Sequence, residues 1–257
     1  MPVAQFIAYW SVYFLLFMRF ATLMMVLPFF NWRGTPALTK IGFAALFSYL
    51  VFLAGVQTPL ALPQHFFSYA LAVMAEVVLG LALGYLVQLI FAAVRMAGQY
   101  LDLQAGFAMS SVFDPMFAGQ VTIYGQFYYL LTLIVFFVTN AHHHLFIALS
   151  RSVALVPPGG VVFHAGLIPP FIEFFAQMVQ IALQLAAPIL AILFFCDLAL
   201  GLIAKTVPQL HVFLVGLPLK VGVALFSIFL ILPYLIPVLE NIFAKIQENL
   251  LILMRLL

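Results

Sequence analysis

The chain has 257 residues, of which 67% are hydrophobic and only 6% are charged. An ordinary soluble domain carries about four times that share of charged side chains, so the composition excludes a free-standing soluble enzyme. The net charge of +2 is too small, and its charges too scattered, for a nucleic-acid-binding protein. The single cysteine, Cys196, excludes internal disulfides and a cysteine-rich metal site. Most of the surface must therefore face lipid or other subunits.

Apolar blocks separated by polar or turn-forming residues divide the chain, and they predict an all-α membrane protein. No charged region precedes the first block, which begins at Val3, so we expect a retained membrane helix and not a cleaved signal peptide. The blocks are 3–30, 41–62, 66 to about 109, 121–150, 165–205 and 212–239.

Two of these blocks, 66–109 and 165–205, would form helices about 60 Å long, twice the thickness of the hydrocarbon core of a bilayer. Each is therefore expected to fold as a tight hairpin, to break midway, or to extend beyond the bilayer into protein surroundings. Prolines predict broken or re-entrant helices in the later blocks, with the last block cut into pieces shorter than a full span. These prolines are Pro188, Pro208, Pro218, Pro233 and Pro237.

Polar and small residues share narrow faces of the third and fifth blocks. A helix over 76–106 places its polar residues from 84 onward within about a 60° arc, and the fifth block has polar residues at steps of four, three and four. We favour packing seams between helices, with a water-filled path as the alternative. The seam residues are Glu76, Gly80, Gly84, Gln88, Arg95, Gln99 and Asp102 in the third block, and Glu173, Gln177, Gln180 and Gln184 in the fifth.

The segment 106–122 is semi-apolar and rich in turn-forming residues, although it lies between two apolar blocks. Its Asp-Pro pair favours a turn, and its methionines can fill an irregular gap without a fixed shape. A plain connector is the alternative. Because an exposed loop would be more polar, we predict a buried or pore-occluding loop. Its residues of interest are Gly106, Phe107, Met109, Ser110, Ser111, Phe113, Asp114, Pro115, Met116 and Phe117.

Motifs of enzymes are weak or absent, which predicts a protein that is not an enzyme and needs no cofactor or metal. The histidines at 142–144 would point about 100° apart on a helix, so they would not converge on one ion, and we expect an interfacial polar tip. Cys196, in an apolar run beside Asp197, is expected to be an inert packing thiol. Asp197 and Lys205 lie about 80° apart around a helix and need not pair directly.

Four motifs carry a resemblance to a known family. Residues 204–220 read Ala-Lys-Thr-Val-Pro-Gln-Leu-His-Val-Phe-Leu-Val-Gly-Leu-Pro-Leu-Lys, and 93–98, 103–107 and 113–115 read Ala-Val-Arg-Met-Ala-Gly, Leu-Gln-Ala-Gly-Phe and Phe-Asp-Pro. In these motifs, in block order and in length, the chain resembles the FliR family of type III export gate subunits. Related subunits of virulence secretion systems share the Pro-Gln-Leu-x-x-Phe core. The signature residues are Lys205, Pro208, Gln209, Phe213, Gly216, Pro218 and Lys220.

The resemblance implies a single-copy subunit of the flagellar export gate, a multi-pass protein of the inner membrane at the flagellum basal body, assembled with FliP and FliQ beside FlhA and FlhB. It implies one domain over 1–257, with a FliP-like part to about residue 164 and a FliQ-like hairpin from about 165. The segment 106–122 would plug a pore that passes unfolded rod, hook and filament proteins. The alternatives are an injectisome gate subunit and an ion-coupled transporter. Glu76, Arg95, Asp102 and Asp197 would be the intramembrane ionisable groups of such a transporter.

Overall fold

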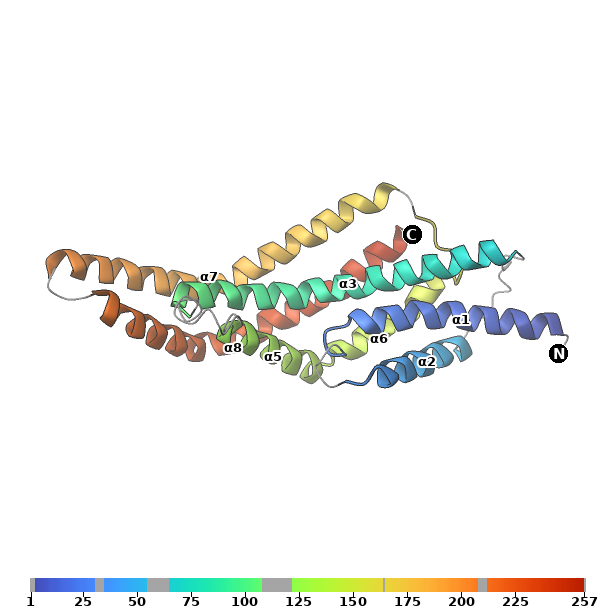
Figure 1. Ribbon diagram of the computed structural model, residues 1–257, viewed down its shortest axis with the longest axis horizontal. Coiled ribbons are helices and arrows are strands. Elements are labelled where there is room, and N and C mark those ends of the chain that lie inside the picture. The colour runs from blue at the N-terminus through green and yellow to red at the C-terminus, as the bar shows by residue number, and fades with distance from the viewer. Residues whose placement is uncertain are drawn as a thin grey trace, which may run out of the picture. The chain divides into compact units, whose positions relative to one another are not determined.

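The computed structural model of the chain is built from helices (Figure 1). It describes residues 3–30, 35–54, 65–107, 122–163, 165–207 and 212–256. Within these ranges every regular element is a helix, which confirms the predicted all-α fold. The elements are α1 (Val3–Val26), α2 (Ala37–Leu53), α3 (Phe66–Ala105), α5 (Ile123–Val138), α6 (Ala141–Leu155), the 3-10 turn η1 (Ala165–Leu167), α7 (Ile168–Thr206) and α8 (Val212–Arg255).

Among the described residues, four helices are long and apolar enough to cross a membrane. They are α1, α3, α7 and α8, and the pair α5 and α6 adds a fifth span if its two broken halves count as one. The apolar stretch of α3 is 61% buried within the chain, whereas those of α7 and α8 are only 17% and 22% buried. α3 is therefore a central helix, while α7 and α8 leave most of their apolar surface to lipid or to neighbouring subunits.

α3 and α7 correspond to the two blocks that are too long for a simple span. They contain 40 and 39 residues, so each is about 60 Å long. Neither folds as a hairpin and neither ends midway, because each is one continuous helix and Pro188 lies inside α7. Of the three expected outcomes, the one that remains is a helix that extends beyond the hydrocarbon core.

The prediction that prolines cut the last block into short pieces is wrong. α8 continues over 44 residues with Pro218, Pro233 and Pro237 inside it. A proline removes one backbone hydrogen bond and crowds the carbonyl four residues earlier, which bends a helix without ending it. In apolar surroundings the other backbone groups have no water to bond with, so the helix persists on both sides of each proline.

The fourth block, by contrast, contains a break that its apolar composition did not predict. α5 ends at Val138 and α6 begins at Ala141. Between them Asn140 has a φ of 57°, a left-handed conformation that asparagine tolerates better than most residues with a side chain. The Asn140 carbonyl then accepts a hydrogen bond from the backbone N–H of His143 at 2.9 Å, which starts the first turn of α6.

Two compact units can be distinguished in the chain, and the three longest helices, α3, α7 and α8, contribute to both. Unit 1 comprises Met1–Leu89, Asn140–Phe175 and Ala244–Leu257, and unit 2 comprises Ile90–Thr139 and Ala176–Phe243. The expected division near residue 164, between a FliP-like part and a FliQ-like part, concerns resemblance to other proteins and not compactness. It stays a prediction.

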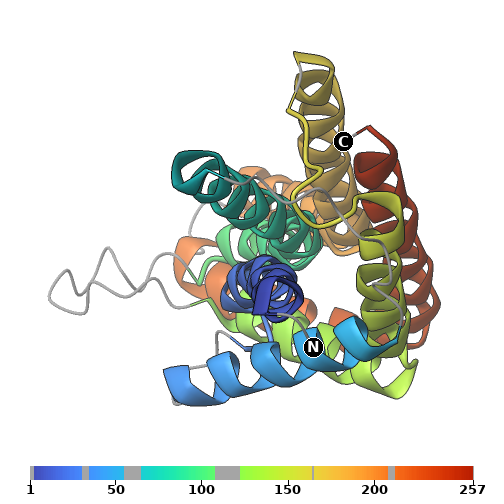
Figure 2. The ribbon, with the colours of Figure 1, turned by 90° about the vertical axis from the view of Figure 1, so that its right-hand side faces the viewer.

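In unit 1, α1 lies at the centre of its neighbours. Figure 2 shows α1 nearly end-on in dark blue, with α2 on one side and the first part of α3 on the other. The Phe20 ring of α1 meets the Phe47 ring of α2 edge-on, with centroids 4.8 Å apart, and Phe47 in turn lies 5.4 Å from Phe146 of α6. Aromatic side chains thus join three helices of this unit.

In unit 2, the ring of Phe91 on α3 likewise joins three helices. Its ring lies 5.5 Å from that of Phe136 on α5 and 6.3 Å from that of Phe243 on α8. Phe91 and Phe136 are fully buried. The second half of α3 is therefore held by apolar contacts on two sides, and its polar residues lie beside this core.

Candidate functional site

Glu76, one of the predicted seam residues, belongs to a fully buried ion pair in unit 1. The Arg19 Nε and Nη2 atoms donate to its two carboxylate oxygens, at 2.5 and 3.0 Å. Arg19 Nη1 also donates to the carbonyl oxygens of Ser152 and Val156, at 3.4 and 2.9 Å. Glu76 Oε1 accepts a further bond from the backbone N–H of Gly159 at 2.8 Å. The cluster links α1, α3, the end of α6 and the turn that follows it.

Arg19 is a residue that the sequence reasoning missed, although the sequence contained the signal. An arginine within an apolar block needs a carboxylate partner, because an unpaired charge in such surroundings is costly. The position of Gly159 could not have been inferred. Its φ of 78° is one that favours glycine, and it turns the amide towards Glu76.

Gly80 and Gly84 lie against α1. A Cβ on Gly80 would overlap Thr22 and the Arg19 carbonyl, and one on Gly84 would come within 2.9 Å of the Val26 Cβ. The absence of side chains here lets the two helix backbones approach, as expected for a small-residue packing pair.

The next three residues of the stripe have different environments. Gln88 is half-buried, and its side-chain oxygen is buried without a partner among the described residues. Arg95 is exposed, and its guanidinium carbon lies 4.5 Å from the centre of the Tyr129 ring, in cation–π geometry. Gln99 is exposed. The polar face that the sequence predicts for α3 is thus buried at some positions and exposed at others.

Asp102 ends the stripe and is almost fully buried in unit 2, with 4% of its surface exposed. Its Oδ1 accepts a hydrogen bond from the backbone N–H of Tyr124 at 2.9 Å, and its Oδ2 accepts one from Gly125 at 3.1 Å. Both amides belong to the first turn of α5. Asp102 therefore connects α3 to α5 and does not pair with a charged side chain in the described part of the chain.

Most of the predicted plug segment lies outside the described residues. Gly106 and Phe107 are described and follow directly on α3, and the chain is described again from Thr122, just before α5. The residues of interest outside the described ranges are Met109, Ser110, Ser111, Phe113, Asp114, Pro115, Met116 and Phe117.

Asp197 has partners that the sequence reasoning did not identify. Its Oδ2 accepts hydrogen bonds from Gln104 Nε2 on α3 at 2.9 Å and from Lys220 Nζ on α8 at 3.0 Å, and Lys220 also lies 2.8 Å from Oδ1. Lys205, whose direct pairing with Asp197 was not expected, is exposed. Lys220, which was singled out only as a signature residue, thus forms an ion pair between α7 and α8.

The remaining signature residues divide between described and undescribed positions. Pro208 and Gln209 lie outside the described ranges, and the side chain of Phe213, in the first turn of α8, is not described either. Gly216 faces α7, where a Cβ would lie 3.1 Å from a Leu200 methyl group. Pro218 lies within α8.

The polar stripe on α7 faces outward. Glu173, Gln180 and Gln184 are exposed, and Gln177 is half-buried. Each stands one residue before a buried apolar residue of the same helix, so the stripe runs along the edge of the face that α7 packs against its own chain. Exposed carboxylate and amide groups on so apolar a helix need protein or water around them, because lipid cannot satisfy their hydrogen bonds.

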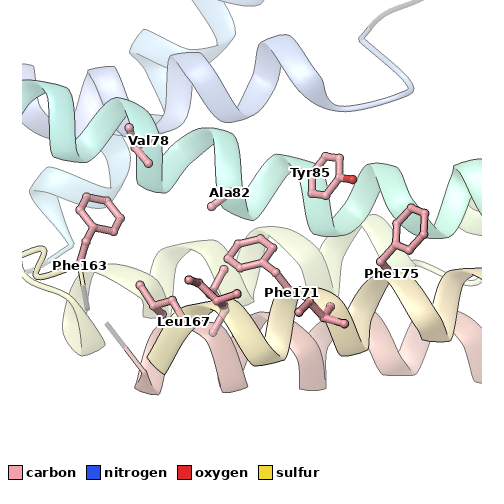
Figure 3. A pocket seen from close by; sticks show the side chains of 10 residues that line it. Val78, Ala82, Tyr85, Phe163, Leu167, Phe171 and Phe175 are labelled. Atoms are coloured by element: carbon pink, nitrogen blue, oxygen red, sulfur yellow. The ribbon is translucent and has the colours of Figure 1, made fainter. Parts of the chain in front are cut away.

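One pocket is an apolar groove in unit 1, with a volume of about 530 Å³. Figure 3 shows Val78, Ala82 and Tyr85 of α3 facing Phe171 and other side chains from the start of α7. Apart from the hydroxyl group of Tyr85, the side chains that line it are apolar. No group of three or more potential metal ligands occurs in the described part of the chain, and the histidines at 142–144 lie in the first turn of α6.

Comparison with known proteins gives a consistent result over almost the whole chain. The model of the bacterial export proteins, family 1, matches residues 10–246. The chain is 35% identical to the flagellar biosynthetic protein FliR of Bacillus subtilis over 242 residues, which is 92% of each chain. It is 28% identical to FliR of Escherichia coli, over 94% of this chain and 92% of that one. It is also 29% identical to the Yop proteins translocation protein T of Yersinia pestis, over 82% of each chain.

Proposed function

The chain belongs to family 1 of the bacterial export proteins, and on this basis we propose that it is a core subunit of the flagellar type III protein export gate. The observation that carries the proposal is the 35% identity to a flagellar FliR protein over 92% of both chains. The two flagellar relatives named above match over 92% and 94% of this chain, whereas the virulence-type relative matches over 82%, which favours the flagellar system over an injectisome.

In the proposed function the chain is a structural part of a conduit in the inner membrane at the flagellum basal body. Unfolded rod, hook and filament proteins pass through it, and energy and substrate selection come from its partners. The proposed partners are FliP, FliQ, FlhA and FlhB, with this subunit in single copy. The exposed polar stripe of α7 supports an assembly subunit, because lipid cannot satisfy its hydrogen bonds and a chain that worked alone would bury it.

The two polar stripes are proposed to act as packing seams in this assembly. The first stripe supplies contacts within the chain at Glu76, Gly80, Gly84 and Asp102. The second stripe, on α7, is exposed and would face helices of neighbouring subunits. The FliP-like part to about residue 164 and the FliQ-like hairpin from about 165 would each contact the proteins that they resemble.

The segment 106–122 is proposed to close the conduit between export events. Its composition supports this role, since Met109 and Met116 can adapt to an irregular opening and reseal it after a substrate has passed. Its attachment supports it as well, because the segment leaves α3 and returns to α5 at positions where both helices are held by buried contacts.

Deleting residues 108–118 tests this role. We expect cells carrying the shortened chain to leak small ions and solutes, while the gate still assembles as judged by co-purification of its subunits. The control is Gly42→Ala, where an added Cβ meets nothing within 4 Å, and it should leave the membrane tight. Unchanged permeability in an assembled deletion variant would contradict the plug.

A further inference from the structure

Asp102 holds the beginning of α5 from a neighbouring helix. The first amides of a helix have no partner within it, and a carboxylate placed there also interacts favourably with the positive end of the helix dipole. The usual supplier of such a cap is the N-cap side chain, but Thr122 at that position makes no side-chain capping bond. The bonds from Tyr124 and Gly125 to the Asp102 carboxylate replace it.

The same residue also holds the end of α3. The backbone N–H of Phe107 donates to the Asp102 carbonyl at 3.0 Å, and that of Gly106 donates to the Leu103 carbonyl at 3.3 Å. Together with the Gly106 φ of 95°, these two bonds form a Schellman motif, which sets the direction in which the chain leaves the helix. A residue with a side chain at 106 would be strained in this conformation.

A close approach of the two helices makes this double attachment possible. A Cβ on Gly98 of α3 would lie 2.5 Å from the Cα and N atoms of Gly125 on α5. The backbones therefore touch one turn before Asp102, and its short side chain reaches the amides of α5. Arg95, a turn earlier, lies over the Tyr129 ring of the same helix. The contact thus extends along the two helices.

We propose that Asp102 is a positioning residue that fixes the spacing and direction of the two helix ends between which residues 108–121 run. Its carbonyl oxygen secures the exit from α3 and its carboxylate secures the return into α5. The inference rests on the proposed function in one respect, because the consequence for sealing requires that segment 106–122 be the plug.

Hydrogen exchange at the start of α5 tests the positioning directly. In the assembled gate, Asp102→Ala should speed exchange of the Tyr124 and Gly125 amides by about 2- to 30-fold, the effect expected from losing a helix cap. Asp102→Asn keeps one of the two acceptor oxygens and should give an intermediate value. The control is Gly42→Ala on α2, where an added Cβ meets nothing within 4 Å, which should leave exchange at the start of α5 unchanged. If these two amides exchange as slowly in Asp102→Ala as in the wild type, the inference is wrong. If the alanine variant does not assemble, the same result in Asp102→Asn would overturn it.

Solute permeability then separates this inference from the proposed plug, since a merely structural cap would change exchange without opening the membrane. We expect membranes with the Asp102→Ala gate to leak, those with Asp102→Asn to leak less and those with Gly42→Ala to remain tight, each with an assembled gate. If the 108–118 deletion leaks but Asp102→Ala stays tight, the positioning role is wrong and the plug stands. If the deletion itself stays tight, the plug is wrong, and exchange alone decides whether Asp102 positions the two helix ends.

Discussion

The buried pair of Arg19 and Glu76 gives the sharpest test of how this chain is stabilised. Replacing Arg19 by methionine leaves the Glu76 carboxylate buried with only the Gly159 amide as donor, and leaves the Val156 carbonyl without its bond. Replacing Glu76 by leucine leaves the guanidinium buried without a counter-charge. Removing one partner of a buried pair costs about 3–5 kcal/mol, so each single substitution should be strongly destabilising.

The double substitution should cost less than the two single substitutions together. It removes both charges and leaves two backbone groups unpaired, those of Val156 and Gly159, at about 1–3 kcal/mol each. The Ser152 carbonyl keeps a partner, because it also accepts a bond from the backbone N–H of Val156 at 2.8 Å. We therefore expect about 2–6 kcal/mol for the double variant, against about 6–10 kcal/mol if the single effects were independent.

Thermal unfolding of the purified gate measures these differences. For a chain of this size, each kcal/mol lowers the midpoint by about 2–4 °C, so each single substitution should lower it by about 6–20 °C. The double variant should lower it by about 4–24 °C, less than the two single substitutions together. Single variants as stable as the parent, or a double variant whose loss equals the sum of the two, would refute the assignment of a coupled buried pair.

Two further substitutions test other contacts. Gly80→Ala should prevent close packing of α3 on α1, because the added Cβ overlaps Thr22, and we expect a clear loss of assembled gate on gel filtration. Gly42→Ala, where a Cβ meets nothing within 4 Å, is the control and should assemble normally. Asp197→Asn should have little effect, about 0–1 kcal/mol, because the Lys220 pair is partly exposed, with 39% of the Asp197 side chain accessible. A loss as large as that of the buried pair would show that partners enclose it.

The sequence predicted the helices better than it predicted where they end. Apolar blocks gave the existence and approximate position of the helices in chain order, because length and hydropathy reflect the need to pair every backbone group in apolar surroundings. The boundaries failed where local signals compete with that need. Pro233 and Pro237 looked like helix ends but lie inside α8. Asn140, with no proline or glycine beside it, marks a real break.

The contacts of the polar residues were only partly predictable. The stripe that contains Glu76 and Asp102 could be read from helical periodicity, because residues three or four apart share a face. The partner of each residue could not be predicted, since it depends on which other helix packs against that face of α3. Asp102 bonds to backbone amides of α5, and no spacing in the sequence indicates a bond to an amide 22 residues away. For Arg19, the sequence indicated that a carboxylate partner was required, but it did not indicate that this partner would be Glu76.

The rarity of charge makes the few buried carboxylates decisive for the arrangement of this chain. Apolar helix faces can pack against each other in several registers at similar free energy, because dispersion and burial are not directional. A buried carboxylate is different, since it is stable only where donors meet it. Glu76 requires Arg19 and the turn after α6, and Asp102 requires the first turn of α5. Each therefore selects one register of α3 against its neighbours, and so a sequence with few charges can still specify a single arrangement of long apolar helices.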